Sequence, residues 1–160
     1  KDPVAFGRLY DHYVQPIYRY VFSRLGNAPE AEDVTSQTFM AAYESLGRYR
    51  ERGQFSAWLF RIARSKMNDH FRRSRREVGL EAAGEILERE DALGMLIRAE
   101  ELTRIRSIIS HLSEDEQDLI RLRYVADLSF VEIADLLGKR EDDVKKSVYR
   151  LLARLKSQME

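Results

Sequence analysis

The 160-residue sequence contains no cysteine, which excludes a disulfide framework, a thiolate zinc site and a cysteine nucleophile. Its longest unbroken apolar run, residues 39–43, is far too short to span a membrane. The sequence has no glycine-rich phosphate motif and no nucleophile elbow, and its three histidines have no carboxylate or cysteine partner at metal-ligand spacing. We therefore expect no enzyme, no metal and no cofactor. The lack of cysteine and of a visible signal peptide fits a cytoplasmic protein with no membrane segment.

An excess of charge of one sign is also missing, because 27 basic and 27 acidic side chains cancel. The cancellation conceals a segregation along the chain. Residues 1–76 carry a net charge of +6, residues 77–111 carry −4, and residues 112–160 carry −2. Only the N-terminal part therefore has the charge that attracts a polyanionic partner.

Apolar residues recur at three- and four-residue steps through most of the chain, and this period predicts helices. Strand-like alternation is absent from the sequence. From Glu77 onward, Gly79, Gly84 and a run of acids predict a linker, and the helical period resumes at Leu102. The sequence therefore predicts an all-α protein with two small helical bundles, residues 1–76 and 101–160, joined by an acidic linker at 77–100.

The stretch from Arg48 to Arg76 mixes arginines with aromatic residues. Cations hold a phosphate backbone and aromatic rings stack on unpaired bases, so this composition suits single-stranded nucleic acid. The helical spacing of Trp58 and Phe71 equally fits core residues, whereas Tyr49 and Phe55 lie in or beside a basic loop. The arginines that end the stretch also suit the C-terminal end of a helix dipole.

The C-terminal segment carries two capping boxes, each a serine followed three residues later by glutamate, at 113–116 and 129–132. Ala134, Gly138 and Val144 have the spacing of a helix-turn-helix, which needs a small residue at the crossing and a glycine in the turn. The second helix, residues 141–156, would then offer its cations to DNA. A solvated face of mixed charge is the competing interpretation, and the acids at 141–143 favour it because they repel phosphates.

Several motifs, in order, resemble the extracytoplasmic-function (ECF) group of bacterial RNA polymerase sigma factors. AEDVTSQTF at 31–39 is similar to the family's "aeDlvQetF" helix, and FSAWLFRIAR at 55–64 to its "FraWLfrIAr" helix. NDHFRR at 68–73 resembles the "lDelRR" segment. Residues 112–138, ending in LSFVEIADLLG, resemble "LpeeqRevl.LRy…glSyeEIAeiLG". The resemblance covers nearly the whole chain apart from the linker.

The resemblance implies a specificity subunit of core RNA polymerase that recognises promoter DNA and assists melting of the −10 element. Contact with the clamp coiled coil of the β′ subunit is implied for Asp33, Gln37 and Phe39. The −10 element, first as flipped bases and then as a separated strand, is implied to contact Arg48, Tyr49, Arg50, Phe55, Arg61, Arg64, Asn68, Asp69, Arg72, Arg73 and Arg76. The −35 element is implied to contact Arg140, Lys145, Lys146, Tyr149, Arg150 and Arg154, on a bundle that also touches the β flap. An anti-sigma factor is the implied regulatory partner.

The recognition helix departs from the family pattern "SegTVKSRlhRAr". Arg140 replaces the serine cap, and Asp142 and Asp143 replace a small residue and a threonine, whereas Lys145 and Arg150 match. We therefore expect unusual −35 specificity, with binding that is weak or masked by a partner. Ser65, where asparagine is common, is a smaller departure.

Two other function classes compete with this interpretation. A stand-alone helix-turn-helix regulator would need only the C-terminal bundle, yet that segment is net acidic and the arginine-rich third helix would be unexplained. A protein-binding adaptor would leave the arginines at 72–76 without a role. Opening a promoter breaks stacking worth roughly 1.4 kcal/mol per step, so unwinding about ten pairs costs far more than a small neutral protein supplies alone. This cost favours a polymerase subunit.

Overall fold

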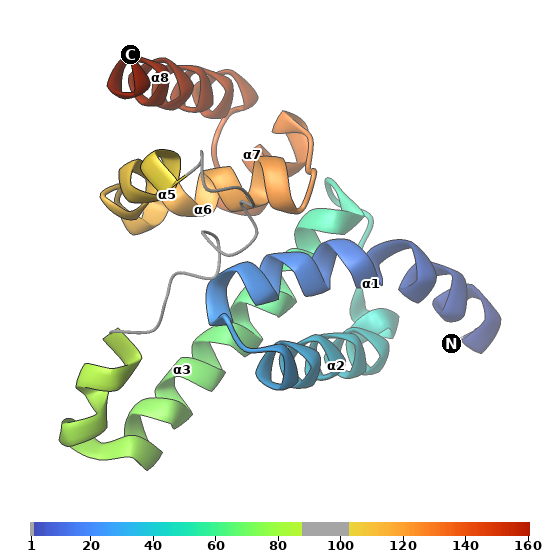
Figure 1. Ribbon diagram of the computed structural model, residues 1–160. Helices are drawn as coiled ribbons and strands as arrows, with labels where there is room; N and C mark the ends of the chain where they lie inside the picture. Colours follow the sequence, from blue (N-terminus) through green and yellow to red (C-terminus); the bar gives the residue numbers. More distant parts are fainter. Residues whose placement is uncertain (1, 88–102) are drawn as a thin grey trace.

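The computed structural model describes residues 2–87 and 103–160, and the described part of the chain consists of helices and connecting loops without strands (Figure 1). The all-α prediction is confirmed. The helices are α1 (Pro3–Leu25), α2 (Ala28–Ser45), the short 3₁₀ helix η1 (Leu46–Arg48), α3 (Phe55–Leu87), α5 (Thr103–Ser110), α6 (Glu114–Ile120), the π-helical turn η3 (Arg121–Val125), α7 (Phe130–Leu137) and α8 (Glu141–Met159).

Local sequence signals set the ends of the first two helices. Asp2 caps α1 by accepting a hydrogen bond from the Val4 amide at 3.0 Å, with proline in the first turn. Gly26 ends α1 in the left-handed conformation with φ 72°, and Asn27 then caps α2 through the Glu30 amide at 3.0 Å. This tight connection turns the chain back, so that α1 and α2 pack side by side, with α3 packed on both.

Helix α3 extends further than the sequence predicts. We expected the linker to start at Glu77, but the helix continues to Leu87, through Gly79 and Gly84. Each glycine costs a helix about 1 kcal/mol relative to alanine. The intervening leucine, alanines, glutamates and isoleucine are better helix formers, so the local preference stays helical. The rest of the predicted linker, residues 88–102, lies outside the described residues.

The C-terminal helices begin where the two capping boxes predict. Ser113 and Ser129 each accept a hydrogen bond from an amide three residues on, while Glu116 and Glu132 accept from the serine amides in return. Gly138 ends α7 in the left-handed conformation with φ 65°. Helices α7 and α8 then pack against each other as the predicted helix-turn-helix.

The two bundles share one hydrophobic core. The main cluster of buried side chains runs from Ile17, Phe60 and other residues of the N-terminal bundle to Leu122 and Ile133 of the C-terminal bundle. Helix α3 packs on α7, and α1 packs on η3. In Figure 1 the C-terminal bundle accordingly lies across α1 and the start of α3, with α8 on the outside. The sequence left open whether the bundles pack together, and in this structure they do.

Candidate functional site

Four aromatic rings form a cluster at the start of α3. The Tyr49 ring lies 5.2 Å from Phe55 and 4.9 Å from Trp58 between centroids, and Phe55 lies 5.6 Å from Tyr13 of α1. All four are half-buried, and Phe55 and Trp58 pack against the core. Trp58 therefore packs against the core, as its helical spacing suggested, and Tyr49 from the basic loop packs against Trp58. Burial, followed by the Glu132 carboxylate and Tyr49, raises the pKa of Tyr13 above its usual range.

Basic and polar side chains follow the same edge of the molecule. Arg48 and Arg50 are exposed in the loop before α3, and the residues at 61, 64, 68 and 72 follow one face of α3 at three- and four-residue steps. Arg72 forms an ion pair with Asp69 one turn back, whereas Arg73 and Arg76 are exposed. The fold therefore aligns four of the predicted −10 residues, at 61, 64, 68 and 72, in one row on α3, whose first turn carries the aromatic cluster.

The predicted polymerase contact lies on α2. The Gln37 amide donates a hydrogen bond to Asp33 Oδ2 at 2.9 Å, which aligns the two side chains one helical turn apart. Phe39 is only 4% exposed, and its ring lies 4.8 Å from Tyr10 of α1. Phe39 is therefore a support under the surface rather than a part of it. It lines an open groove of about 450 Å³ that also includes Met40, which is 63% exposed.

The exposed face of α8 presents the predicted −35 residues. Val144, Val148 and Leu151 are buried, which leaves Lys145, Lys146, Tyr149 and Arg150 exposed. Arg154 forms an ion pair with Glu116 of α6. The pKa of Glu116 is lowered by the hydrogen bond from the Ser113 amide and by Arg154.

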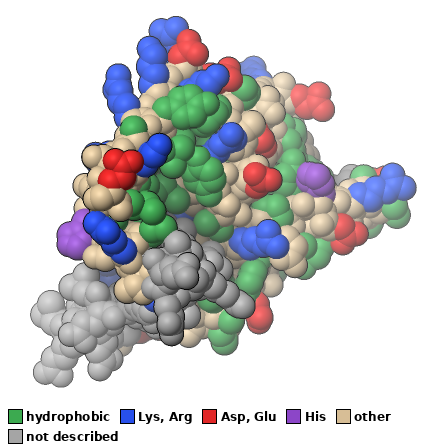
Figure 2. Space-filling view, turned by 45° about the horizontal axis from the view of Figure 1, so that its top comes forward, with side chains coloured by type: hydrophobic (Ala, Val, Ile, Leu, Met, Phe, Trp, Pro, Cys, Tyr) green, Lys and Arg blue, Asp and Glu red, His purple; other side chains and the backbone are tan. Residues whose placement is uncertain are grey.

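Arg140 occupies the cap position of α8 without a side-chain cap, as its replacement of serine predicts. Acids at 141–143 fill the first turn instead, where the helix dipole favours negative charge. In the space-filling view, which brings the top of Figure 1 forward, basic and acidic side chains alternate around apolar patches (Figure 2). The surface of the C-terminal bundle is therefore not a uniform cationic face.

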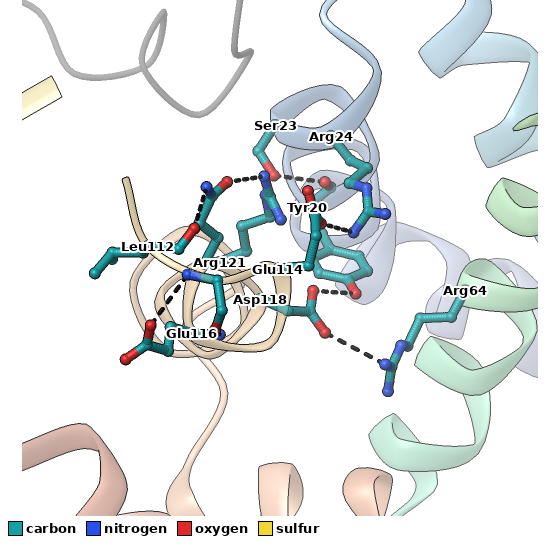
Figure 3. A network of polar contacts seen from close by, with 11 residues as sticks. Tyr20, Ser23, Arg24, Arg64, Leu112, Glu114, Glu116, Asp118 and Arg121 are labelled. Carbon is teal, nitrogen blue, oxygen red and sulfur yellow. Dashed lines mark hydrogen bonds and ion pairs between the residues drawn. The ribbon is translucent and has the colours of Figure 1, made fainter. Parts of the chain in front are cut away.

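A polar network joins the two bundles, and the sequence did not reveal its partners (Figure 3). Tyr20 of α1 donates its hydroxyl proton to Asp118 Oδ1 at 2.8 Å, and Arg64 of α3 lies 3.4 Å from Asp118 Oδ2. Arg24 pairs with Glu114 at 3.0 Å. Burial, followed by the Asp118 carboxylate, raises the pKa of Tyr20 far above its usual range. The segregation of charge between the two halves was the one signal in the sequence for this contact.

The described residues hold no group of three histidine, aspartate or glutamate side chains that could bind a metal ion. Within the same residues, no helix has both the length and the apolar character needed to cross a membrane.

Comparisons with known proteins agree with the motifs. The model of sigma-70 region 2 matches residues 9–77, and the model of sigma-70 region 4 matches residues 102–155. The ECF RNA polymerase sigma factor BldN of Streptomyces coelicolor is 36% identical over 94% of this chain and 59% of BldN. The ECF RNA polymerase sigma factor SigD of Mycobacterium bovis is 31% identical over 91% of this chain and 73% of SigD.

The fold is shared with a solved structure. The sigma factor RpoE from Bartonella quintana, solved in complex with the anti-sigma factor NepR, matches with a TM-score of 0.66 and 20% identity, over 97% of this chain and 96% of that chain. The two sigma-70 regions occur here in order, and SigD is matched over most of its length. The chain therefore belongs to the ECF group of the sigma-70 family of RNA polymerase sigma factors.

Proposed function

We propose that this chain binds core RNA polymerase, directs it to specific promoters and assists melting of the −10 element. In this proposal residues 1–76 dock on the polymerase and recognise the −10 element, residues 77–100 connect, and residues 101–160 recognise the −35 element. The observation that carries the proposal is the row of polar and basic side chains on α3 beside the aromatic cluster. Cations along a strand path with aromatic rings for unpaired bases suit melted DNA, and a regulator of duplex DNA has no need of them.

Asp33 and Gln37 form the proposed contact with the clamp coiled coil of the β′ subunit. Their mutual hydrogen bond holds both side chains in one geometry, so less side-chain freedom is lost on binding. The apolar groove at Met40 and Phe39 adjoins them and offers apolar area to bury. Phe39 acts here by supporting the floor of the groove.

The exposed cations of α8 and Tyr149 form the proposed −35 contact, and the same bundle is proposed to touch the β flap. With acids in its first turn, α8 lacks phosphate attraction where recognition helices approach bases. Of the DNA bases, cytosine offers the major-groove amino donor that a carboxylate accepts. We therefore expect a −35 preference that differs from the common ECF pattern.

An anti-sigma factor is the proposed regulator, in the cytoplasm where the polymerase acts. The RpoE structure that shares this fold was solved with its anti-sigma factor NepR, which supports the proposal for this chain. Since the chain has no cysteine, a thiol-based signal would have to be sensed by the partner.

The test is co-elution with bacterial core RNA polymerase on gel filtration. We expect the wild type to co-elute and Asp33→Arg to lose most of the association, because the reversed charge breaks the hydrogen bond with Gln37 and the proposed contact. Asp11→Arg, which reverses an exposed acid on α1, is the matched control and should co-elute normally. A wild-type chain that ignores the core but shifts duplex DNA alone would favour the stand-alone regulator.

A further inference from the structure

The C-terminal bundle covers the part of the N-terminal bundle that the proposed function assigns to DNA. Helix α7 packs on the start of α3, where the row of basic side chains begins, and η3 packs on α1. The row and the adjoining loop therefore have a protein partner in the free chain.

Asp118 is the acidic partner on α6. Its carboxylate accepts the Tyr20 hydroxyl proton at 2.8 Å with one oxygen and lies 3.4 Å from the Arg64 guanidinium with the other. The Asp118 side chain is 11% exposed and the Arg64 side chain 36%, so the carboxylate is mostly buried while the arginine stays partly in contact with solvent. Figure 3 shows Asp118 between α1 and α3, with its two oxygens directed to different helices.

Asp135 and Glu132 are the acidic partners on α7. Asp135 Oδ2 accepts a hydrogen bond from the Gln54 amide at 2.6 Å, and Arg61 lies 3.3 Å from Asp135 Oδ1. Arg61 also donates to the Asp135 carbonyl, and the Ser56 hydroxyl donates to the Glu132 carboxylate. An amide, a hydroxyl and a guanidinium are thus all directed at carboxylates of one helix.

Gly53 permits this approach. It has φ +81°, and a Cβ built on it would lie 2.4 Å from Asp135 Oδ2. The loop backbone therefore approaches the α7 carboxylate more closely than any side chain at position 53 would allow.

The groups that bind these carboxylates are the groups that bind phosphates. Backbone amides, serine hydroxyls and arginines make most protein contacts with a nucleic-acid backbone, and all three occur here within one stretch of α3 and its preceding loop. A carboxylate offers the same two-oxygen acceptor geometry and the same charge sign as a phosphate.

We propose that Asp118, Glu132 and Asp135 form an internal phosphate mimic, through which the C-terminal bundle closes over the strand path of the free protein. The C-terminal bundle and promoter DNA then compete for Arg61 and Arg64. This inference rests on the proposed function, because it takes that face to be the path of DNA. The proposal also explains how a DNA-binding protein can have no net charge. Carboxylates of the C-terminal bundle neutralise part of the positive charge of the N-terminal bundle.

The test uses the full chain and two readouts. Because the chain lacks cysteine, cysteines introduced at Glu44 and Ser157, both exposed, carry a donor and an acceptor dye for energy transfer between the bundles. The binding probe is a fluorescein-labelled 15-mer of oligothymidylate. The variant is Asp118→Asn/Asp135→Asn, which keeps side-chain volume and removes two charges.

The matched control is Asp115→Asn/Asp127→Asn, which removes two exposed acids of the same bundle outside the contact. Asp127 has φ 58°, a conformation that asparagine adopts readily. We expect the interface variant to lose energy transfer and to bind the oligonucleotide about tenfold more tightly, with the control within twofold of wild type. Circular dichroism melting confirms that both variants remain folded.

Arg61→Ala/Arg64→Ala separates opening from binding. It should also lose energy transfer, but with no gain in oligonucleotide affinity. Unchanged transfer in the interface variant, or lost transfer with unchanged affinity, overturns the proposal. Because both readouts use the free chain, their failure is distinct from failure of the proposed function, which co-elution with core polymerase reports.

Discussion

Asp118 lies at the point where three helices meet, and Tyr20 is its most deeply buried partner. The Tyr20 side chain is 1% exposed, so its hydroxyl proton has no water to replace the carboxylate. A buried phenol next to a carboxylate resists ionisation, because the phenolate would lose its hydration and face a like charge. The pKa of Tyr20 is accordingly raised, with burial as the largest cause.

This raised pKa predicts a specific loss of stability in alkali. The unfolded Tyr20 releases its proton near pH 10.0 while the folded one retains it. The free energy of unfolding therefore keeps this contribution below pH 10 and loses about 1.4 kcal/mol per pH unit above it. Tyr13, whose pKa is also raised, adds to the same loss.

Urea unfolding of wild type and Tyr20→Phe from pH 7 to pH 11 measures the effect. At pH 7 the variant should be less stable by about 1 kcal/mol, the value of one buried hydrogen bond. The difference should shrink above pH 10, because phenylalanine has no proton to lose. Tyr10→Phe, at an exposed ring, is the control. Parallel stability curves for wild type and Tyr20→Phe would contradict the prediction.

At the scale of single elements, helix ends hold the helix-turn-helix in shape. Gly138 takes φ 65°, and its amide bonds to the carbonyls of Ala134 and Asp135, which closes α7 so that α8 can cross it. No atom lies within 4 Å of a Cβ built there, so the cost of a side chain is conformational alone.

We expect Gly138→Ala to lower the free energy of unfolding by about 1–2 kcal/mol, and Gly138→Asn by less, since asparagine tolerates the left-handed region. Gly47→Ala is the matched control, because Gly47 has equally open surroundings without a positive φ. Thermal unfolding of the four proteins distinguishes them. Equal losses in Gly138→Ala and Gly47→Ala would exclude the strain explanation.

Local sequence signals predicted the helices and the termini that carry caps, but they did not predict the C-terminal end of α3. The capping boxes at Ser113 and Ser129, and the glycine at 138, are short-range signals, so sequence alone located these termini. The predicted end of α3 at residue 76 is too early, because Gly79 and Gly84 were taken to end the helix. The residues around these glycines are good helix formers, and α3 continues to Leu87.

At the scale of the whole molecule, one core crosses both bundles. Buried residues such as Phe60 and Ile133 belong to the same cluster, although they lie far apart in sequence. Bundles that share buried apolar area lose it together when either unfolds. We therefore expect a single cooperative unit in the free protein.

Differential scanning calorimetry tests this expectation. The wild type should show one transition with equal calorimetric and van't Hoff enthalpies. Asp118→Asn/Asp135→Asn should broaden or split the transition, because the polar part of the shared contact is weakened. Two resolved transitions in the wild type would show that the bundles unfold independently.

The basic residues of the site could be predicted from the sequence, but their acidic partners in the C-terminal bundle could not. Sequence motifs named Arg61 and Arg64 and gave them a role with DNA, yet nothing near them in sequence indicated Asp135 or Asp118 as partners. Such contacts depend on how two bundles dock, and docking is set by the summed shape of both surfaces. Charge segregation gave the two halves opposite net charges, but it predicted neither their contact nor the residues that make it.

Gly53 has a consequence for the genetics of this protein. Because the Asp135 carboxylate occupies the space of its missing side chain and the backbone has φ +81°, another residue at this codon strains the loop and displaces that carboxylate from the Gln54 amide, while every charge in the molecule is kept. Mutations at this codon would therefore weaken the contact between the two bundles even though no charged residue is lost.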